Sequence, residues 1–148
     1  MTTSQRSGTF DFVTRKKVFS ADFKSLAKIS QFIEESADRS GFAAEEIYSL
    51  TLAVDEACSN VIEHGFPPDN TESIEITVTD QPKTLEIDII DKGIPFDLSK
   101  AGKVSLPKKI SKRSEGGMGI FFIQQYIDVI QYRTEGGRNI LSLVKYKK

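Results

Sequence analysis

The sequence has little that would suit a secreted or membrane-embedded protein. Its 148 residues include a single cysteine, Cys58, so an internal disulfide is excluded and nothing demands an oxidising compartment. No apolar run approaches the ~20 residues that span a bilayer, and the polar N-terminus lacks the apolar segment of a signal peptide. We therefore expect a cytoplasmic protein that does not itself bind a membrane.

An excess of charge of either sign is also missing. Lys and Arg number 20 and Asp and Glu number 21, which gives a formal net charge of -1. This balance argues against nucleic acid as the main partner, because binding to phosphate backbones usually needs a basic face. The 39% hydrophobic and 28% charged residues are typical of a globular domain with a sizeable core. We expect one domain over residues 9–148, preceded by a disordered tail over residues 1–8.

Hydrophobic periodicity predicts five strands and three helices. Alternation predicts strands near residues 9–19, 72–80, 84–91, 129–135 and 139–146. Helical spacing predicts helices near residues 21–40, 43–64 and 117–127, the first capped by Ser20. Because strands follow one another in runs, the pattern favours an α+β fold: a two-layer sandwich of a mostly antiparallel five-stranded sheet with three helices on one face.

The second predicted helix carries Glu56 and Asn60 four residues apart, so both side chains project from one face. Asparagine has low helix propensity, which suggests a functional requirement at this position. An Asn carbonyl oxygen is a good Mg²⁺ ligand, and a Glu one turn away can accept a proton from an attacking hydroxyl group. Taken alone, the pair fits a solvated acidic helix face with a surface Asn better.

The strand near 84–91 ends in an Asp-Lys-Gly turn at Asp91 and Gly93. Such turns are common at strand ends, so an ordinary turn is the simpler interpretation of these residues alone. In the functional interpretation, the Asp91 carboxylate accepts a hydrogen bond from the exocyclic amine of adenine. Gly93 then lets the backbone approach the base, and Ile94 and Pro95 form walls of the base pocket.

Four residues, Gly116, Gly117, Met118 and Gly119, precede an apolar run that predicts the third helix. Glycines at a helix N-terminus expose backbone N–H groups that favour an anion such as phosphate, although many short glycine clusters are simply turns. The loop before them carries six basic and no acidic residues between Asp97 and Glu115. It suits a cationic lid over a triphosphate, and equally a solvated basic loop.

Together these motifs resemble the GHKL ATPase superfamily, whose nucleotide-binding fold is called the Bergerat fold. The order matches: a helix with Glu-x-x-x-Asn, then Asp-x-Gly-x-Pro-Phe after a strand, then Gly-Gly-Met-Gly at the start of a helix. The resemblance covers residues 10–146. The stretch from Ala53 to Phe66 is particularly similar to bacterial anti-sigma-factor serine/threonine protein kinases, which phosphorylate a serine on an anti-anti-sigma (STAS-domain) protein.

The resemblance implies a role for each motif residue. Glu56 is the general base, Asn60 the Mg²⁺ ligand and Asp91 the adenine reader. Gly93, Gly117 and Gly119 shape the nucleotide loops, and a lid cation, Arg113 or Lys112, lies near the γ-phosphate. ATP and Mg²⁺ are the implied cofactors.

The resemblance also implies the partners. They are an anti-anti-sigma protein and a sigma factor, and a homodimer through the exposed edge of the first strand is plausible. The only histidine, His64, suits a helix terminus better than a phosphate acceptor. Two alternatives remain at this point: a module that binds ATP and sequesters a partner without phosphorylating it, and an adaptor domain that binds no nucleotide.

Overall fold

The computed structural model describes residues 2–7, 10–96 and 118–148, and this part of the chain contains six strands and three α-helices. The strands are β1 (Thr2–Ser7), β2 (Phe10–Ser20), β3 (Ser73–Asp80), β4 (Thr84–Asp91), β5 (Val129–Glu135) and β6 (Arg138–Tyr146). The helices are α1 (Leu26–Arg39), α2 (Ala44–Gly65) and α4 (Met118–Tyr126). None of the described helices is both long and apolar enough to cross a bilayer.

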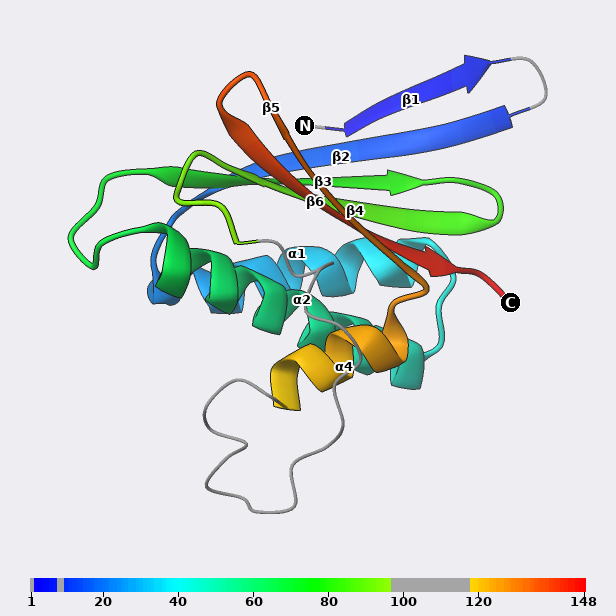
Figure 1. Ribbon diagram of the computed structural model, residues 1–148. Helices are drawn as coiled ribbons and strands as arrows, with labels where there is room; N and C mark the ends of the chain where they lie inside the picture. The colour runs from blue at the N-terminus through cyan, green and yellow to red at the C-terminus, as the bar shows by residue number, and fades with distance from the viewer. Residues whose placement is uncertain (1, 8–9, 97–117) are drawn as a thin grey trace.

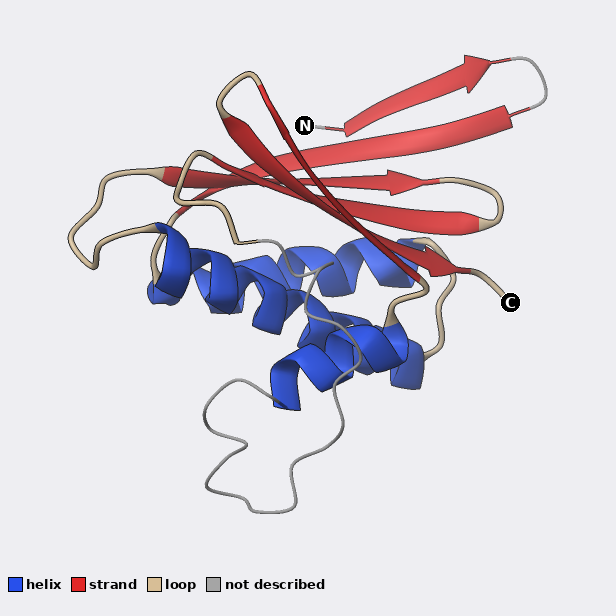
Figure 2. Cartoon of the chain, in the orientation of Figure 1, coloured by secondary structure: helices blue, strands red, loops and turns tan. Residues whose placement is uncertain are grey.

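The strands form one antiparallel sheet in the order β1-β2-β3-β4-β6-β5. All three helices lie on the same side of this sheet (Figure 1; Figure 2). In β3 and β4, buried side chains alternate with partly exposed ones, because successive residues of a strand point to opposite faces. The predicted α+β sandwich is therefore confirmed.

The N-terminus differs from the prediction. Residues 1–8 were expected to be a disordered tail, but Thr2–Ser7 pairs antiparallel with Phe10–Arg15 and adds a sixth strand at the edge of the sheet. This segment lacks hydrophobic alternation, so the sequence pattern does not reveal it. Pairing satisfies backbone groups of β2 that would otherwise form an open sheet edge.

The start of the first helix also differs. Ser20 is the last residue of β2 and does not cap the helix. Asp22 instead caps a short 3-10 turn, and its side chain accepts a hydrogen bond of 2.8 Å from the backbone N–H of Lys24. This turn, Phe23–Ser25, then leads into α1. The predicted stop is confirmed, because Gly41 after the helix has a φ of 89°, a conformation that favours glycine.

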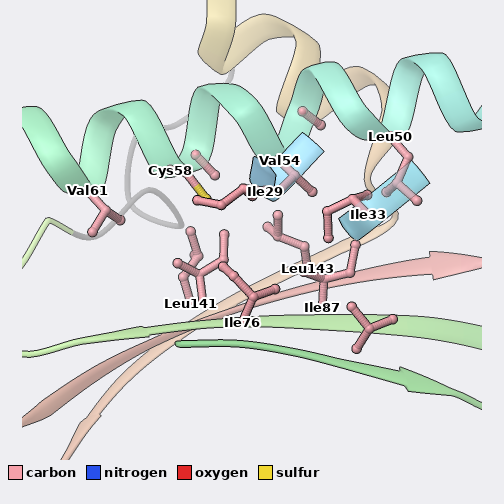
Figure 3. Packing of buried hydrophobic residues seen from close by; sticks show 14 of the residues in the cluster. Ile29, Ile33, Leu50, Val54, Cys58, Val61, Ile76, Ile87, Leu141 and Leu143 are labelled. Atoms are coloured by element: carbon pink, nitrogen blue, oxygen red, sulfur yellow. The ribbon is translucent and has the colours of Figure 1, made fainter. Parts of the chain in front are cut away.

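The core lies between the helices and the inner face of the sheet. Ile29 and Ile33 of α1, Val54 of α2 and Ile87 of β4 are fully buried within one hydrophobic cluster. Figure 3 shows side chains from the helices meeting those of the strands across this layer. This packing fixes the rotation of α2 about its axis, because its apolar stripe must face the sheet.

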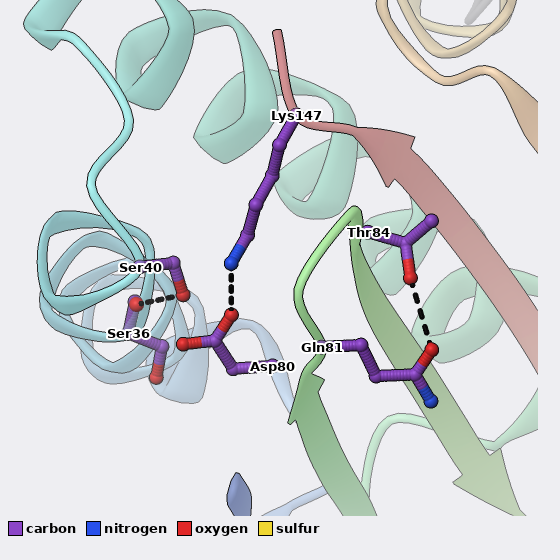
Figure 4. Close-up of polar contacts among 6 residues, drawn as sticks. All are labelled: Ser36, Ser40, Asp80, Gln81, Thr84 and Lys147. Atoms are coloured by element: carbon purple, nitrogen blue, oxygen red, sulfur yellow. Dashed lines mark hydrogen bonds and ion pairs between the residues drawn. The ribbon is translucent and has the colours of Figure 1, made fainter. Parts of the chain in front are cut away.

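Polar contacts hold the ends of the elements together. The side chain of Lys147 forms an ion pair with Asp80, and Thr84 donates to the Gln81 side chain across the β3–β4 turn (Figure 4). Ser40 donates to the carbonyl of Ser36 at the end of α1, also drawn in Figure 4. The Lys147–Asp80 ion pair ties the C-terminus to the end of β3, whereas the other two bonds stabilise the β3–β4 turn and the end of α1.

Candidate nucleotide-binding site

Asn60 is buried in α2, with 6% of its surface exposed. This excludes the simpler interpretation of a surface asparagine. Its side-chain nitrogen has no hydrogen-bond partner among the described residues. A buried polar group without a partner costs about 1–3 kcal/mol, so a buried amide with spare bonding capacity fits a residue that contacts a bound ligand. An amide oxygen at this position also suits Mg²⁺, which prefers hard oxygen ligands.

Glu56 lies one helical turn before Asn60 and is half-buried. Burial raises the pKa of its carboxyl group, and the charges of Asp55 and Glu63 raise that pKa further. A raised pKa makes the carboxylate a stronger base near neutral pH. The helix therefore presents a strengthened base and a buried amide at the spacing that the sequence predicted.

Asp91 lies at the end of β4 and is also buried, with 6% of its surface exposed. Its Oδ1 accepts two hydrogen bonds, from the backbone N–H of Gly93 at 2.8 Å and from Nδ2 of Asn139 at 3.0 Å. Neither bond uses Oδ2. Burial raises the pKa of Asp91, while the bonds from Asn139 and Gly93 act in the opposite direction. An ordinary Asp-x-Gly turn explains the bond from Gly93, but not the second bond from Asn139 on the neighbouring strand.

The structure brings Asp91 close to the middle of α2. The thiol of Cys58, fully buried between Glu56 and Asn60 along the helix, has its pKa raised by burial and by the charges of Asp55 and Asp91. In Figure 3, Cys58 points from α2 towards the sheet. The helix motif and the Asp91 motif therefore lie near each other, although 31 to 35 residues separate them in the sequence.

Asn139 at the start of β6 was not predicted as a site residue. It is 5% exposed, and its Nδ2 donates both to Asp91 and to the carbonyl oxygen of Gly93, the latter at 2.8 Å. The register of β4 with β6 places Asn139 directly opposite Asp91. In the sequence, the only signal for Asn139 is a polar residue at the start of an apolar strand. Its position opposite Asp91 depends on which strand pairs with β4, and the tertiary fold decides that pairing.

Gly93 is explained by a close contact different from the one predicted. A Cβ at this position would lie 2.6 Å from the carbonyl oxygen of Gly65 and 2.9 Å from the ring of Phe66. The same carbonyl accepts a 3.0 Å hydrogen bond from the N–H of Ile94. Gly93 therefore allows the turn after β4 to lie against the C-terminal end of α2. The approach of Gly93 to a base remains a prediction, as does the role of Ile94, which is 69% exposed.

The end of α2 is joined to this turn by a second contact. The rings of His64 and Phe96 are stacked, with centroids 4.4 Å apart and an interplanar angle of 13°. His64 lies in the last turn of the helix, as the sequence suggested. The stacking holds Phe96 against the last turn of α2.

Helix α4 begins at Met118, close to the start near residue 117 that the sequence predicted. Met118 and Gly119 form the first turn of α4, and this helix packs against α2, which carries Glu56 and Asn60. Figure 1 shows the two helices side by side. The remaining predicted residues of the phosphate loop and lid lie outside the described residues: Lys112, Arg113, Gly116 and Gly117.

Comparison with known proteins places these motifs in context. A family profile described as "Histidine kinase-like ATPase domain" matches residues 19–145. Proteins described as "Serine-protein kinase RsbW" from Bacillus cereus (strain AH187) and Bacillus anthracis (strain CDC 684 / NRRL 3495) are each 29% identical over 141 residues. Each alignment covers 93% of this chain and 86% of the relative.

Among solved structures, the chain is similar to the Acinetobacter baumannii histidine kinase AdeS. The TM-score is 0.47 at 13% identity, and the match covers 89% of this chain and 68% of that one. The assignment to a family therefore rests on the sequence profile, which spans most of the chain.

Proposed function

The chain belongs to the histidine kinase-like ATPase domain family, and from this premise we propose that it is an ATP-dependent serine/threonine protein kinase acting as an anti-sigma-type regulatory switch. The names of its relatives, serine-protein kinases, support this function. The observation that carries it is the pairing on α2 of a half-buried Glu56 with a buried Asn60, whose Nδ2 has no hydrogen-bond partner among the described residues. A module that only binds a partner has no need of this base.

The proposed mechanism is mainly positioning and charge neutralisation, as is usual for phosphoryl transfer. Asp91 accepts a hydrogen bond from the exocyclic amine of adenine. The carbonyl oxygen of Asn60 would hold Mg²⁺, and the bound ion would supply charge neutralisation for the phosphates. Backbone N–H groups at the start of α4 and a lid cation bind the remaining phosphate oxygens. Glu56 takes the proton from the serine hydroxyl of the partner as that oxygen bonds to the γ-phosphorus and ADP leaves.

We propose an anti-anti-sigma (STAS-domain) protein as the phosphorylated partner and a sigma factor as a second partner. Neither nucleic acid nor a membrane is part of this proposal, and the cytoplasm is the proposed location. A homodimer is included as well. The sheet edge that contacts the second copy would be β1 rather than β2, because β1 pairs with the first half of β2.

The test is transfer of ³²P from [γ-³²P]ATP to recombinant STAS-domain proteins of the source organism. Glu56→Gln should bind Mg-ATP as wild type does but transfer phosphate about 10²–10⁴-fold more slowly, because the base is lost. Glu45→Gln is the matched control: it removes an exposed carboxylate from the same helix and should retain transfer.

Full transfer by Glu56→Gln would exclude the role of this residue. Wild-type protein that binds Mg-ATP and the partner but transfers no phosphate would instead establish the sequestering module.

A further inference from the structure

Asn139 ties together two parts of the candidate adenine site through one atom. The two N–H groups of its amide reach the carboxylate of Asp91 and the backbone carbonyl of Gly93. Both donors of this nearly fully buried side chain are therefore used, one by the last residue of β4 and one by the turn that follows it. Its neighbours on β6, Ile140 and Leu141, are buried and apolar, so an apolar residue would be the ordinary choice at this position.

The two bonds received by Asp91 converge on the same oxygen. Asn139 Nδ2 and Gly93 N both donate to Oδ1, which fixes the rotation of the carboxylate and leaves Oδ2 outside both bonds. We propose that Asn139 is a positioning residue for base recognition, which holds Oδ1 of Asp91 so that Oδ2 is the acceptor for the exocyclic amine of adenine. This inference rests on the proposed function, in which Asp91 reads the base.

The electrostatics point the same way. Burial raises the pKa of Asp91 and so favours the neutral acid, which is a poorer acceptor, and the bond from Asn139 opposes this effect. The bond to the Gly93 carbonyl adds a second constraint, because it holds the turn that leads to Ile94. Asn139 thus acts on both the charge and the position of the reading group without touching the nucleotide.

A purely structural role for Asn139 predicts a different pattern of ligand binding. If the residue only stabilised the fold, its loss would weaken all nucleotides equally. If it acts through Asp91, its loss should weaken only ligands that carry the exocyclic amine. Purine riboside triphosphate has the same sugar, phosphates and ring system as ATP but lacks this amine, so the two ligands separate the two roles.

The experiment is titration calorimetry of Mg-ATP and Mg-purine riboside triphosphate with wild type, Asn139→Leu and Asn139→Thr. Asn139→Leu should lose about 10- to 100-fold in affinity for ATP, the cost of a hydrogen bond to a charged group, with affinity for the analogue close to wild type. Asn139→Thr keeps one donor and should recover part of the ATP affinity. Ser142→Ala, at the other buried polar residue of β6, should change neither affinity.

Asp91→Ala separates failure of this inference from failure of the proposed function. If wild type binds no Mg-ATP, or if Asp91→Ala keeps the preference for ATP over the analogue, base reading by Asp91 is wrong. If Asp91→Ala loses the preference but the Asn139 variants keep it, or lose both ligands equally, the inference about Asn139 is overturned. Should Asn139→Leu fail to fold, a selective loss of ATP affinity in Asn139→Thr supports the inference, and an equal loss of both ligands overturns it.

Discussion

At the scale of single residues, Glu56 is surrounded by other carboxylates on α2, and this predicts the pH dependence of phosphate transfer. Burial, Asp55 and Glu63 all raise its pKa above the ordinary 4.5 of a glutamate. A base acts only when ionised, so the rate should rise with pH through this raised pKa. Removing a negative neighbour favours ionisation, so Asp55→Asn and Glu63→Gln should each move the rise to lower pH.

Rate profiles between about pH 4 and 8, where carboxylates and perturbed carboxylates ionise, are the measurement. Asp55→Asn should give the larger displacement, because Asp55 has the larger effect of the two neighbours. Asp38→Asn, an exposed carboxylate on α1, is the control and should leave the profile unchanged. An unchanged profile in both α2 variants would show that another group sets the pH dependence.

The residues that the sequence could reveal are those with local signatures. Glu56 and Asn60 follow from helical spacing, and Asp91 from its place at a strand end. The burial of Asn60, which excludes the surface alternative, needed the packing of α2 on the sheet. Asn139 depends on which strand pairs with β4, and that choice is made by long-range contacts.

At the scale of elements, the contact between Gly65 and Gly93 joins the end of α2 to the turn after β4. Gly93→Ala would place a methyl group 2.6 Å from the carbonyl oxygen of Gly65, so the turn must move away from the helix. We expect a loss of about 1–3 kcal/mol in the free energy of unfolding, typical of overpacking, together with weaker Mg-ATP binding because Asp91 moves with the turn.

Chemical denaturation and calorimetry measure the two effects. Gly137→Ala is the control: its φ of 77° makes alanine strained by about 1–2 kcal/mol, but its hairpin turn has open space around it. This variant should lose stability and keep ATP affinity. Equal affinity in both variants would show that the position of the turn does not control the site.

Elements with strong periodicity were predicted within a few residues of their observed ends. α2 and the two hairpins are examples, because their apolar patterns and glycine turns act locally. The first helix began later than expected because β2 continues to Ser20 and a 3-10 turn capped by Asp22 precedes α1. β1 was missed because an edge strand of polar residues depends on backbone pairing alone.

At the scale of the whole molecule, β1 lies at the edge of the sheet and pairs only with β2. Among the residues whose burial the structure describes, the hydrophobic cluster draws on α1, α2, α4 and strands β2, β3, β4 and β6, with side chains of β5 packed against it. Deletion of residues 1–8 should therefore lower the melting temperature by no more than about 4 °C, the equivalent of ~1 kcal/mol, and leave Mg-ATP affinity unchanged.

Thermal melts of the truncated and full chains test this, with Ile33→Ala as the comparison. Truncating this fully buried side chain should cost about 2–5 kcal/mol and a much larger fall in melting temperature. A comparable fall on deletion of residues 1–8 would contradict the view that β1 is peripheral to the fold.

The central claim is that α2, the Asp91 turn and the start of α4 together form a site for ATP with Mg²⁺. The most direct test is a thermal melt of the chain with Mg-ATP, with Mg-GTP and without nucleotide. We predict stabilisation by Mg-ATP alone, of about 2.7 kcal/mol at a ligand concentration ~100 times the Kd, and its loss in Asp91→Ala. No shift with Mg-ATP at any concentration, or an equal shift with Mg-GTP, would contradict the account.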